Sequence, residues 1–208
     1  QTCALPIYVQ YANTQQLTDR VLKNELDLVL LNQNTIDHNQ LDSHTLLTER
    51  LYVVLSDHML ARYFPDRYPQ CKQDFAQGAD LAEFQSIPFV MNRRQFNSRT
   101  VLDNYLQARG IRLQCLMELT QLDIHFMMTA RDYAASFCWS MYLPTIHQMN
   151  QSDPTRHLNV FPIRGLDTTN RFSLVTLKGK ILPAYGRDLV SLIKQKCASF
   201  AHANPADV

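Results

Sequence analysis

The sequence predicts an α/β protein with two lobes, in which the chain leaves the first lobe and later returns to it. Short runs rich in β-branched and aromatic residues alternate with segments whose apolar residues recur at helical spacing, the pattern of strands alternating with helices. This alternation comes in two successive sets, and a last strand and helix follow them. With 46% hydrophobic residues among 208, the chain has ample apolar surface to bury a core.

The first set begins with residues 7–12, whose β-branched and aromatic side chains predict a strand. Either Asn13 or Thr14 can cap the helix that follows, and Asn24 suits the left-handed turn at its end. The apolar residues 26–31 predict a buried strand. A strand, a helix and a strand in this order predict a right-handed crossover in a parallel sheet.

The next part of the chain is less regular. Residues 46–55 predict one strand or two abutting strands, and residues 56–60 predict a loop or short helix. Residues 61–84 are largely polar and are interrupted by proline and glycine, which predicts an irregular insertion with short helices. We expect no chemistry in this insertion.

The second set begins with a strand predicted over residues 87–91. A helix is predicted from about Ser98, and Gly110 ends it at the position where a left-handed residue is favoured. Residues 113–119 predict the next strand.

Thr120, followed three residues later by Asp123, is typical of a capping box and predicts that Thr120 caps the next helix. Beyond that helix we expect a strand over residues 134–139, a short helix near residues 141–149 and a strand over residues 158–163. This last strand leads out of the second set.

The final segment returns the chain to the first lobe. Residues 171–177 alternate in the manner of a strand. An amphipathic helix then follows, marked by Leu189, Leu192, Ile193 and Cys197.

Charge and cysteine content exclude several classes of function. The chain has 20 Lys and Arg against 19 Asp and Glu, a formal net charge of +1, so it lacks the basic field expected of a segment that grips DNA. Its five cysteines are scattered without a Cys-x-x-Cys pair, which indicates a reducing cytoplasm rather than zinc or redox chemistry. The sequence has no run of about 18 apolar residues, so we expect no membrane span.

The two ends of the chain are set aside. Residues 1–7 match the translation of a common sequencing adapter, and no initiator methionine precedes them. We interpret them as suspected adapter-derived residues, with a mature N-terminus after processing as the alternative. Residues 202–208 are treated as a tail.

Five short sequence motifs are similar to those of a known family, and they occur in the same order and at the same spacing as in that family. They occupy residues 24–28 at a helix end, 49–54 in a hydrophobic strand, 57–61 in the turn after it, 88–90 in a strand entering the second lobe, and 159–163 in a strand leaving it. On these motifs the chain resembles the effector-binding domain of LysR-type transcription regulators, nearly throughout from Tyr8 to Phe200.

Two departures from the family pattern stand out. Met59 replaces a proline in the turn. The usual glycines before the strand of the second lobe are replaced by Asp132 and Ala134, which makes the backbone there less permissive and puts the local shape of the pocket in question.

The resemblance implies two Rossmann-like lobes of the type II periplasmic binding protein fold. Lobe I is expected over residues 8–60 and 164–201, and lobe II over residues 61–163. The family pattern also implies an N-terminally truncated chain, without the winged helix-turn-helix, the linker helix, and the first strand and helix of lobe I. DNA contact would come only through that missing N-terminal domain.

The function implied by the resemblance is that of a sensor. A small metabolite binds between the two lobes and changes how dimers pack within a tetramer, which controls transcription. The alternative is an exported solute-binding protein of a transporter with the same fold. An upstream helix-turn-helix or an upstream signal peptide would separate the two.

Candidate effector-binding residues follow from the rule that open α/β sheets bind ligands beyond the carboxyl ends of their strands, near helix N-termini. The candidates, all at strand-to-helix junctions or strand ends, are Asn13, Thr14, Asn92, Arg93, Asn97, Ser98, Arg99, Thr120, Gln121 and Trp139. The arginines favour an anionic effector. The alternatives are helix capping for Asn13, Thr14 and Thr120, solvated surface arginines, and a core position for Trp139.

Catalysis finds no support in the sequence. Ser136 and Ser140 lack a Gly-x-Ser-x-Gly elbow, and the histidines show no metal-binding spacing. His125 is more plausibly a hydrogen-bonded structural residue than a base or ligand. We therefore expect no enzymatic activity, no metal and no cofactor.

Overall fold

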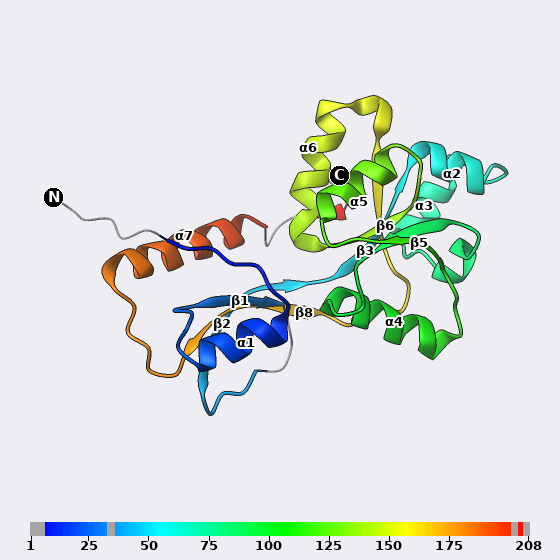
Figure 1. The fold of residues 1–208 in the computed structure, drawn as a ribbon. Coiled ribbons are helices and arrows are strands. Elements are labelled where there is room, and N and C mark those ends of the chain that lie inside the picture. The colour runs from blue at the N-terminus through cyan, green and yellow to red at the C-terminus, as the bar shows by residue number, and fades with distance from the viewer. Residues whose placement is uncertain (1–6, 33–35, 201–203, 206–208) are drawn as a thin grey trace. The chain divides into compact units, whose positions relative to one another are not determined.

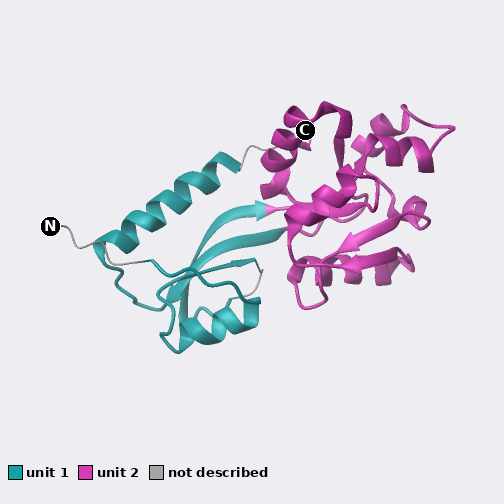
Figure 2. Ribbon diagram, turned by 45° about the horizontal axis from the view of Figure 1, so that its top comes forward, with its two compact units in different colours: residues 1–48, 170–201 teal, residues 49–169, 202–208 magenta. Residues whose placement is uncertain are grey.

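The computed structural model of the protein describes residues 7–32, 36–200 and 204–205. Helices and strands alternate along the chain, so the protein is of the mixed α/β class (Figure 1). The chain forms two compact units, one of residues 1–48 with 170–201 and one of residues 49–169 with 202–208 (Figure 2). It therefore leaves the first unit and returns to it, as the sequence predicts.

The first unit is built on a three-stranded sheet in the order β1, β8, β2. The strands β1 (Val29–Asn32) and β8 (Asn170–Leu177) pair antiparallel, and β2 (Leu41–Glu49) is the other neighbour of β8. Helix α1 (Thr14–Leu22) packs on β1 and β8, and α7 (Ala184–Phe200) is the C-terminal helix. The buried core of this unit consists of Val21, Val29, Leu31, Leu41 and Val175.

Local side-chain chemistry determines both ends of α1. The Asn13 side chain accepts a hydrogen bond from the Gln16 N–H at 2.9 Å, and the Gln16 side chain accepts one from the Asn13 N–H at 3.4 Å, which is a capping box. Asn24 follows the helix with a φ of 57°. The prediction of a left-handed residue at this position is confirmed.

The strand predicted over residues 7–12 is wrong. Residues 7–13 adopt no strand, and Tyr8 and Tyr11 are 81% and 95% exposed. A strand requires a neighbour to pair with, and residue composition alone does not supply one. The predicted parallel crossover is wrong for the same reason, because β1 pairs antiparallel with a strand from the far end of the chain.

In the second unit, β3 (Leu51–Ser56) is the central strand of a three-stranded sheet. It pairs antiparallel with β6 (Ser136–Trp139) on one side and β7 (Leu158–Pro162) on the other. A separate parallel pair consists of β4 (Pro88–Met91) and β5 (Gln114–Glu118). The Val90 N–H donates to Ala135 O at 2.9 Å, which connects β4 to the segment that enters β6.

Helices connect and cover these strands. The α-helices are α2 (Asp57–Tyr63), α3 (Cys71–Ala76), α4 (Asn97–Arg109), α5 (Leu122–Ala130) and α6 (Leu143–Ser152). Short 3₁₀ turns cover Leu81–Phe84, Ser140–Tyr142 and Pro154–Arg156. Gly110 ends α4 with a φ of 66°, as the sequence predicts.

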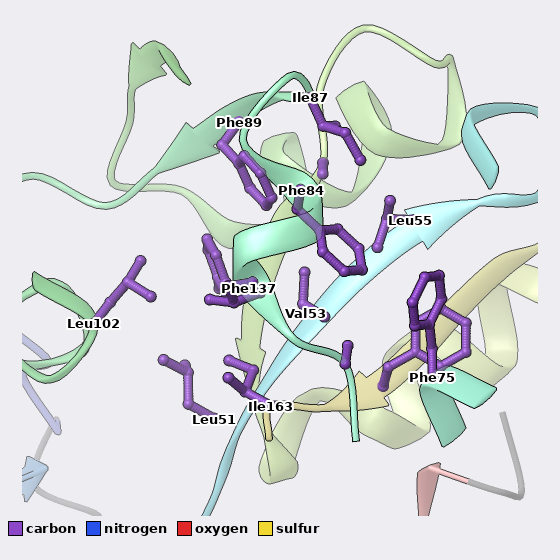
Figure 3. Close-up of a cluster of buried hydrophobic side chains, with 14 of the residues drawn as sticks. Leu51, Val53, Leu55, Phe75, Phe84, Ile87, Phe89, Leu102, Phe137 and Ile163 are labelled. Atoms are coloured by element: carbon purple, nitrogen blue, oxygen red, sulfur yellow. The ribbon is translucent and has the colours of Figure 1, made fainter. Parts of the chain in front are cut away.

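The core of the second unit is rich in phenylalanine (Figure 3). The Phe75 and Phe84 ring centroids lie 5.0 Å apart, and the Phe89 and Phe137 rings stack at 5.0 Å. Phe75 and Phe84 come from the segment that the sequence marks as an irregular insertion. That segment does contain short helices, and it also contributes central core residues.

Two features of the second unit differ from what the sequence predicts: its boundaries and the N-cap of α5. Residues 51–56 were expected in lobe I, but β3 pairs with β6 and β7, so the structure divides the chain after Thr48 and Thr169 rather than after residues 60 and 163. The N-cap of α5 is Gln121 rather than Thr120, and it makes no side-chain capping bond. Because the helix begins one residue later than expected, Asp123 lies too early in it for a capping box with Thr120.

Candidate functional site

A small cavity of about 20 Å³ lies in the second unit, where β4 and β6 end and α4 begins. Its walls combine apolar side chains with a few polar ones. The lining residues are Leu51, Val90, Met91, Asn92, Ser98, Arg99, Leu102, Leu122, His125, Phe137, Cys138 and Trp139. A cavity needs roughly 10–15 Å³ to hold a water molecule, so this one has room for at least one water-sized group.

Four of the predicted effector-binding residues lie together in this wall: Asn92, Ser98, Arg99 and Trp139. The Asn92 Nδ2 donates to Ser98 Oγ at 2.7 Å, and the Arg99 guanidinium donates to the Asn92 carbonyl oxygen at 3.0 Å. These bonds join the end of β4 to the first turn of α4. The wall is therefore held in place by its own polar groups.

The Arg99 side chain is already engaged by two carboxylates. It is only 6% exposed, its Nε donates to Asp103 at 2.7 Å, and its Nη1 donates to Glu118 at 2.8 Å. Burial acts to lower the pKa of Arg99, but the bonds to Asp103 and Glu118 outweigh it and raise the pKa. The arginine therefore stays charged, and its charge is balanced within the protein.

His125 contributes a second polar group to the cavity wall from α5. It is 1% exposed, and its Nε2 lies 3.2 Å from Leu119 O. Burial lowers the pKa of His125, opposed by the Leu119 carbonyl and the charge of Asp123, so the ring is neutral near pH 7. Since a carbonyl oxygen only accepts hydrogen bonds, Nε2 carries the hydrogen and Nδ1 is an acceptor.

One of the lining residues, Asn92, carries a buried oxygen atom with an unmet hydrogen bond. Asn92 Oδ1 is buried and has no partner among the described residues. Buried polar atoms are nearly always bonded in folded proteins, so this acceptor stands out among the polar atoms of the lining residues.

The remaining predicted residues lie outside this cavity wall. Arg93, Thr120 and Gln121 are exposed, and Thr120 Oγ1 donates to Gln121 Oε1 at 3.0 Å. Asn97 is half-buried at the start of α4, while Asn13 and Thr14 belong to the first unit. Their role in effector binding stays a prediction.

Sequence reasoning missed part of this wall. The expectation that His125 is a hydrogen-bonded structural residue agrees with its burial and its contact with Leu119 O, but its place in the cavity wall was not predicted. The sequence also did not place Asp103 or Glu118 beside Arg99. The spacing of four residues between Arg99 and Asp103 was an available signal for an ion pair on one helix face. Glu118 lies on β5 and gave no such signal, because only the fold brings β5 to α4.

At Asp132, one of the two positions where the family has glycine, the backbone keeps a conformation that favours glycine. Asp132 has a φ of 62°, the left-handed conformation that glycine would adopt. Its carboxylate accepts a hydrogen bond from Ser56 and lies 3.1 Å from His58 Nδ1. Asp132 does not line the cavity.

A wider hollow of about 390 Å³ lies between α5 and α6. Its charged side chains are Arg131, Asp153 and Arg156, of which Asp153 and Arg156 pair at 3.5 Å. All three side chains are on the surface. Size alone would favour this hollow, but of the two only the smaller cavity is lined by buried polar side chains, those of Arg99 and His125.

The sequence matches the family described as the LysR substrate binding domain over residues 4–198. The chain belongs to this family. The match spans most of both compact units, so family membership rests on the whole domain rather than on one motif. Comparison of the sequence with curated proteins gives no match.

Solved structures of LysR-family regulatory domains share the fold of this LysR substrate-binding domain. The regulatory domain of CcmR from Synechocystis PCC6803, in complex with 2-PG, is 16% identical with a TM-score of 0.62, covering 88% of this chain and 79% of that one. The effector-binding domain of QuiR in complex with shikimate is 15% identical with a TM-score of 0.56, covering 91% and 77%. The predicted type II periplasmic binding protein fold is confirmed.

Two further properties concern the described part of the chain. None of its helices has the length and apolar character needed to cross a membrane. Among the same residues, no three His, Cys, Asp or Glu side chains gather closely enough to hold a metal ion.

Proposed function

We propose that this LysR substrate-binding domain senses a small metabolite through the cavity between β4, β6, α4 and α5, and that it acts as a regulatory part of a transcription regulator rather than as an enzyme. Family membership supports the regulatory role. Similar domains whose structures are described as complexes with 2-PG and shikimate support a small-molecule effector.

The convergence of buried and half-buried polar groups on one cavity is the observation that carries this proposal. Asn92, Ser98, Arg99 and His125 come from a strand end and two helices, and apolar side chains surround them. Binding sites for small molecules have this composition, with a few placed polar groups in an apolar wall. An effector group seated here would touch both α4 and α5 and would shift the population toward the arrangement that binds it better.

Contact with DNA is assigned to a separate N-terminal winged helix-turn-helix domain. The net charge of +1 on this chain fits a segment that does not itself hold nucleic acid. The full-length CbnR structure in complex with its target DNA is 12% identical with a TM-score of 0.59, and the chain covers 59% of it. We further propose a cytoplasmic location and a homodimer or tetramer as the working assembly.

A thermal-shift screen of the 208-residue chain tests this proposal. Organic acids, amino acids, amines and aromatic acids are tested at millimolar concentration. A ligand at 100 times its Kd should raise the Tm by about 5–10 °C for a chain of this size. Asn92→Leu should abolish the shift, whereas Asn104→Ala, at an exposed position on the same helix, should preserve it.

A hit that survives Asn92→Leu would place the effector elsewhere and contradict the assignment of this cavity. A signal peptide in the upstream reading frame would favour an exported solute-binding protein instead. An upstream helix-turn-helix would support the regulator.

A further inference from the structure

The charge balance around the cavity carries an inference about the chemistry of the effector. Arg99 supplies one positive charge, and Asp103 and Glu118, at 2.7 Å and 2.8 Å from it, supply two negative charges. The formal charge of these three side chains is therefore negative, and the two carboxylates, whose side chains are 41% and 39% exposed, lie outside the cavity lining. An entering carboxylate would have to compete with two protein carboxylates for a guanidinium that they already bind.

The hydrogen-bonding groups of the wall point to the same conclusion. Asn92 Oδ1 is a buried acceptor without a partner among the described residues, and the neutral His125 ring has Nδ1 as its acceptor. An anion brings further acceptors, which neither atom can bond. A group with N–H or O–H donors can satisfy both.

The surroundings of His125 favour Nδ1 as the hydrogen-bond acceptor of the ring. Its Nε2–H is committed to Leu119 O at 3.2 Å. The Thr129 hydroxyl donates to the His125 carbonyl oxygen at 3.0 Å and lies 2.8 Å from Ser136 Oγ. All three side chains are at most 1% exposed, and the contact of Nε2 with Leu119 O favours the tautomer in which Nδ1 is the acceptor.

The first turn of α4 acts in the opposite direction, because the N-terminus of a helix favours an anion. That effect is equivalent to about half a positive charge. Added to Arg99, it still does not exceed the two carboxylates.

We propose that this cavity receives the protonated amino group of the effector, so that the effector is an amine or amino acid recognised here through its ammonium group rather than through a carboxylate. The inference rests on the proposed function and departs from the anionic effector that the sequence favours. Any carboxylate of the same molecule would be bound outside this cavity.

The test uses three probes that share a propyl chain and differ only in the head group: n-propylammonium, 1-propanol and butyrate. Ligand-observed NMR titration of the 208-residue chain gives their Kd values. We expect n-propylammonium to bind at least about tenfold more tightly than butyrate, with 1-propanol between them. The ranking should not depend on which compound the thermal-shift screen identifies.

Three substitutions connect this ranking to the wall. The substitution Asn92→Asp preserves the shape of the side chain and adds a negative charge. It should therefore strengthen the binding of n-propylammonium and further weaken the binding of butyrate. Glu118→Gln removes one negative charge and should reduce the preference for ammonium at least about tenfold. Asp66→Asn makes the same kind of change at an exposed position in the loop before α3 and should leave the ranking unchanged.

The outcomes separate this inference from the proposed function. Tighter binding of butyrate that is lost in Asn92→Asp would overturn the ammonium assignment and leave the cavity as the effector site. Failure of all three probes to bind, with a screened metabolite that is insensitive to Asn92→Asp, would overturn both. Loss of ammonium preference in Asp66→Asn would show that the ranking reflects general surface charge and would also overturn the inference.

Discussion

At the scale of single residues, Asp132 shows how a side chain can occupy a position that the family gives to glycine. Its φ of 62° lies in the left-handed region, which aspartate tolerates better than most residues because its short polar side chain can bond locally. Here the carboxylate accepts a bond from Ser56, whose Oγ also accepts from the Met59 N–H at 3.1 Å. Asp132 therefore ties the turn before β6 to the start of α2.

Substitution of Asp132 separates the backbone contribution from the side-chain contribution. Asp132→Gly removes the bond to Ser56 but accepts the left-handed backbone, whereas Asp132→Ala removes the bond and strains the backbone. We expect Asp132→Ala to be less stable than Asp132→Gly by about 1–2 kcal/mol. Urea unfolding monitored by circular dichroism gives both free energies. Equal values would mean that the turn relaxes away from a positive φ.

His125 makes stability depend on pH in a definite direction. Burial holds the pKa of His125 below the value of 6.5 that an exposed histidine has, so the unfolded chain binds this proton more readily than the folded one. The contribution of the neutral His125 ring to the free energy of unfolding is fully present above pH 6.5. It is lost as the pH falls from 6.5 toward the pKa of the folded state. Burial lowers the pKa of His157 as well, with the same sign.

We expect the urea concentration at the unfolding midpoint to decrease as the pH is lowered from 7.5 to 5.5. The substitution His125→Gln should make that decrease smaller. His157→Gln should remove a further part of the decrease. His44→Gln, at an exposed position, should leave the profile as it is. A profile unchanged by His125→Gln would show that the buried ring does not resist protonation.

The site itself was only partly predictable from residues taken one at a time. Asn92, Ser98 and Arg99 were found because strand ends and helix starts are adjacent in the sequence. The charge of the site was not predictable, because Glu118, which pairs with Arg99, lies 19 positions away in the sequence. An arginine in a predicted binding loop therefore indicates an anion only when no nearby carboxylate has already bound it.

At the scale of elements, helices were predicted better than strand pairing. The ends of α1 and the end of α4 depend on residues within one or two turns, such as Asn13, Asn24 and Gly110. The strand expected over residues 7–12 and the parallel partner of β1 depend on distant chain segments. Strand composition is a local property, whereas strand pairing is set by the fold.

The contrast between α1 and α5 gives a prediction about capping. Asn13→Ala removes a formed capping bond and should lower the free energy of unfolding by about 1 kcal/mol. Thr120→Ala should change it by less than about 0.5 kcal/mol, because Thr120 precedes the actual N-cap of α5 and makes no bond to its backbone. Chemical denaturation of the two variants checks both values. A larger loss in Thr120→Ala would restore the capping role that the sequence suggested.

At the scale of the whole molecule, the two units differ in how they are built from the chain. The sheet of the first unit has β8 at its centre, so this unit needs segments from both ends of the sequence. Most of the second unit comes from residues 49–169, and the described residues of its two hydrophobic clusters lie between Leu51 and Leu166. The cavity lining falls inside the same range, from Leu51 to Trp139.

This difference predicts that residues 49–169 fold as an independent domain, because they contain a complete sheet around β3 and the phenylalanine-rich core. A protein of these residues alone should unfold cooperatively in urea and give dispersed amide NMR signals, whereas residues 7–48 alone should give neither, because they lack β8. Since Asn92, Arg99 and His125 all remain, the shortened protein should also bind n-propylammonium within about threefold of the full chain if the cavity recognises the effector by itself. Folding without that binding would contradict recognition of the effector by this cavity alone.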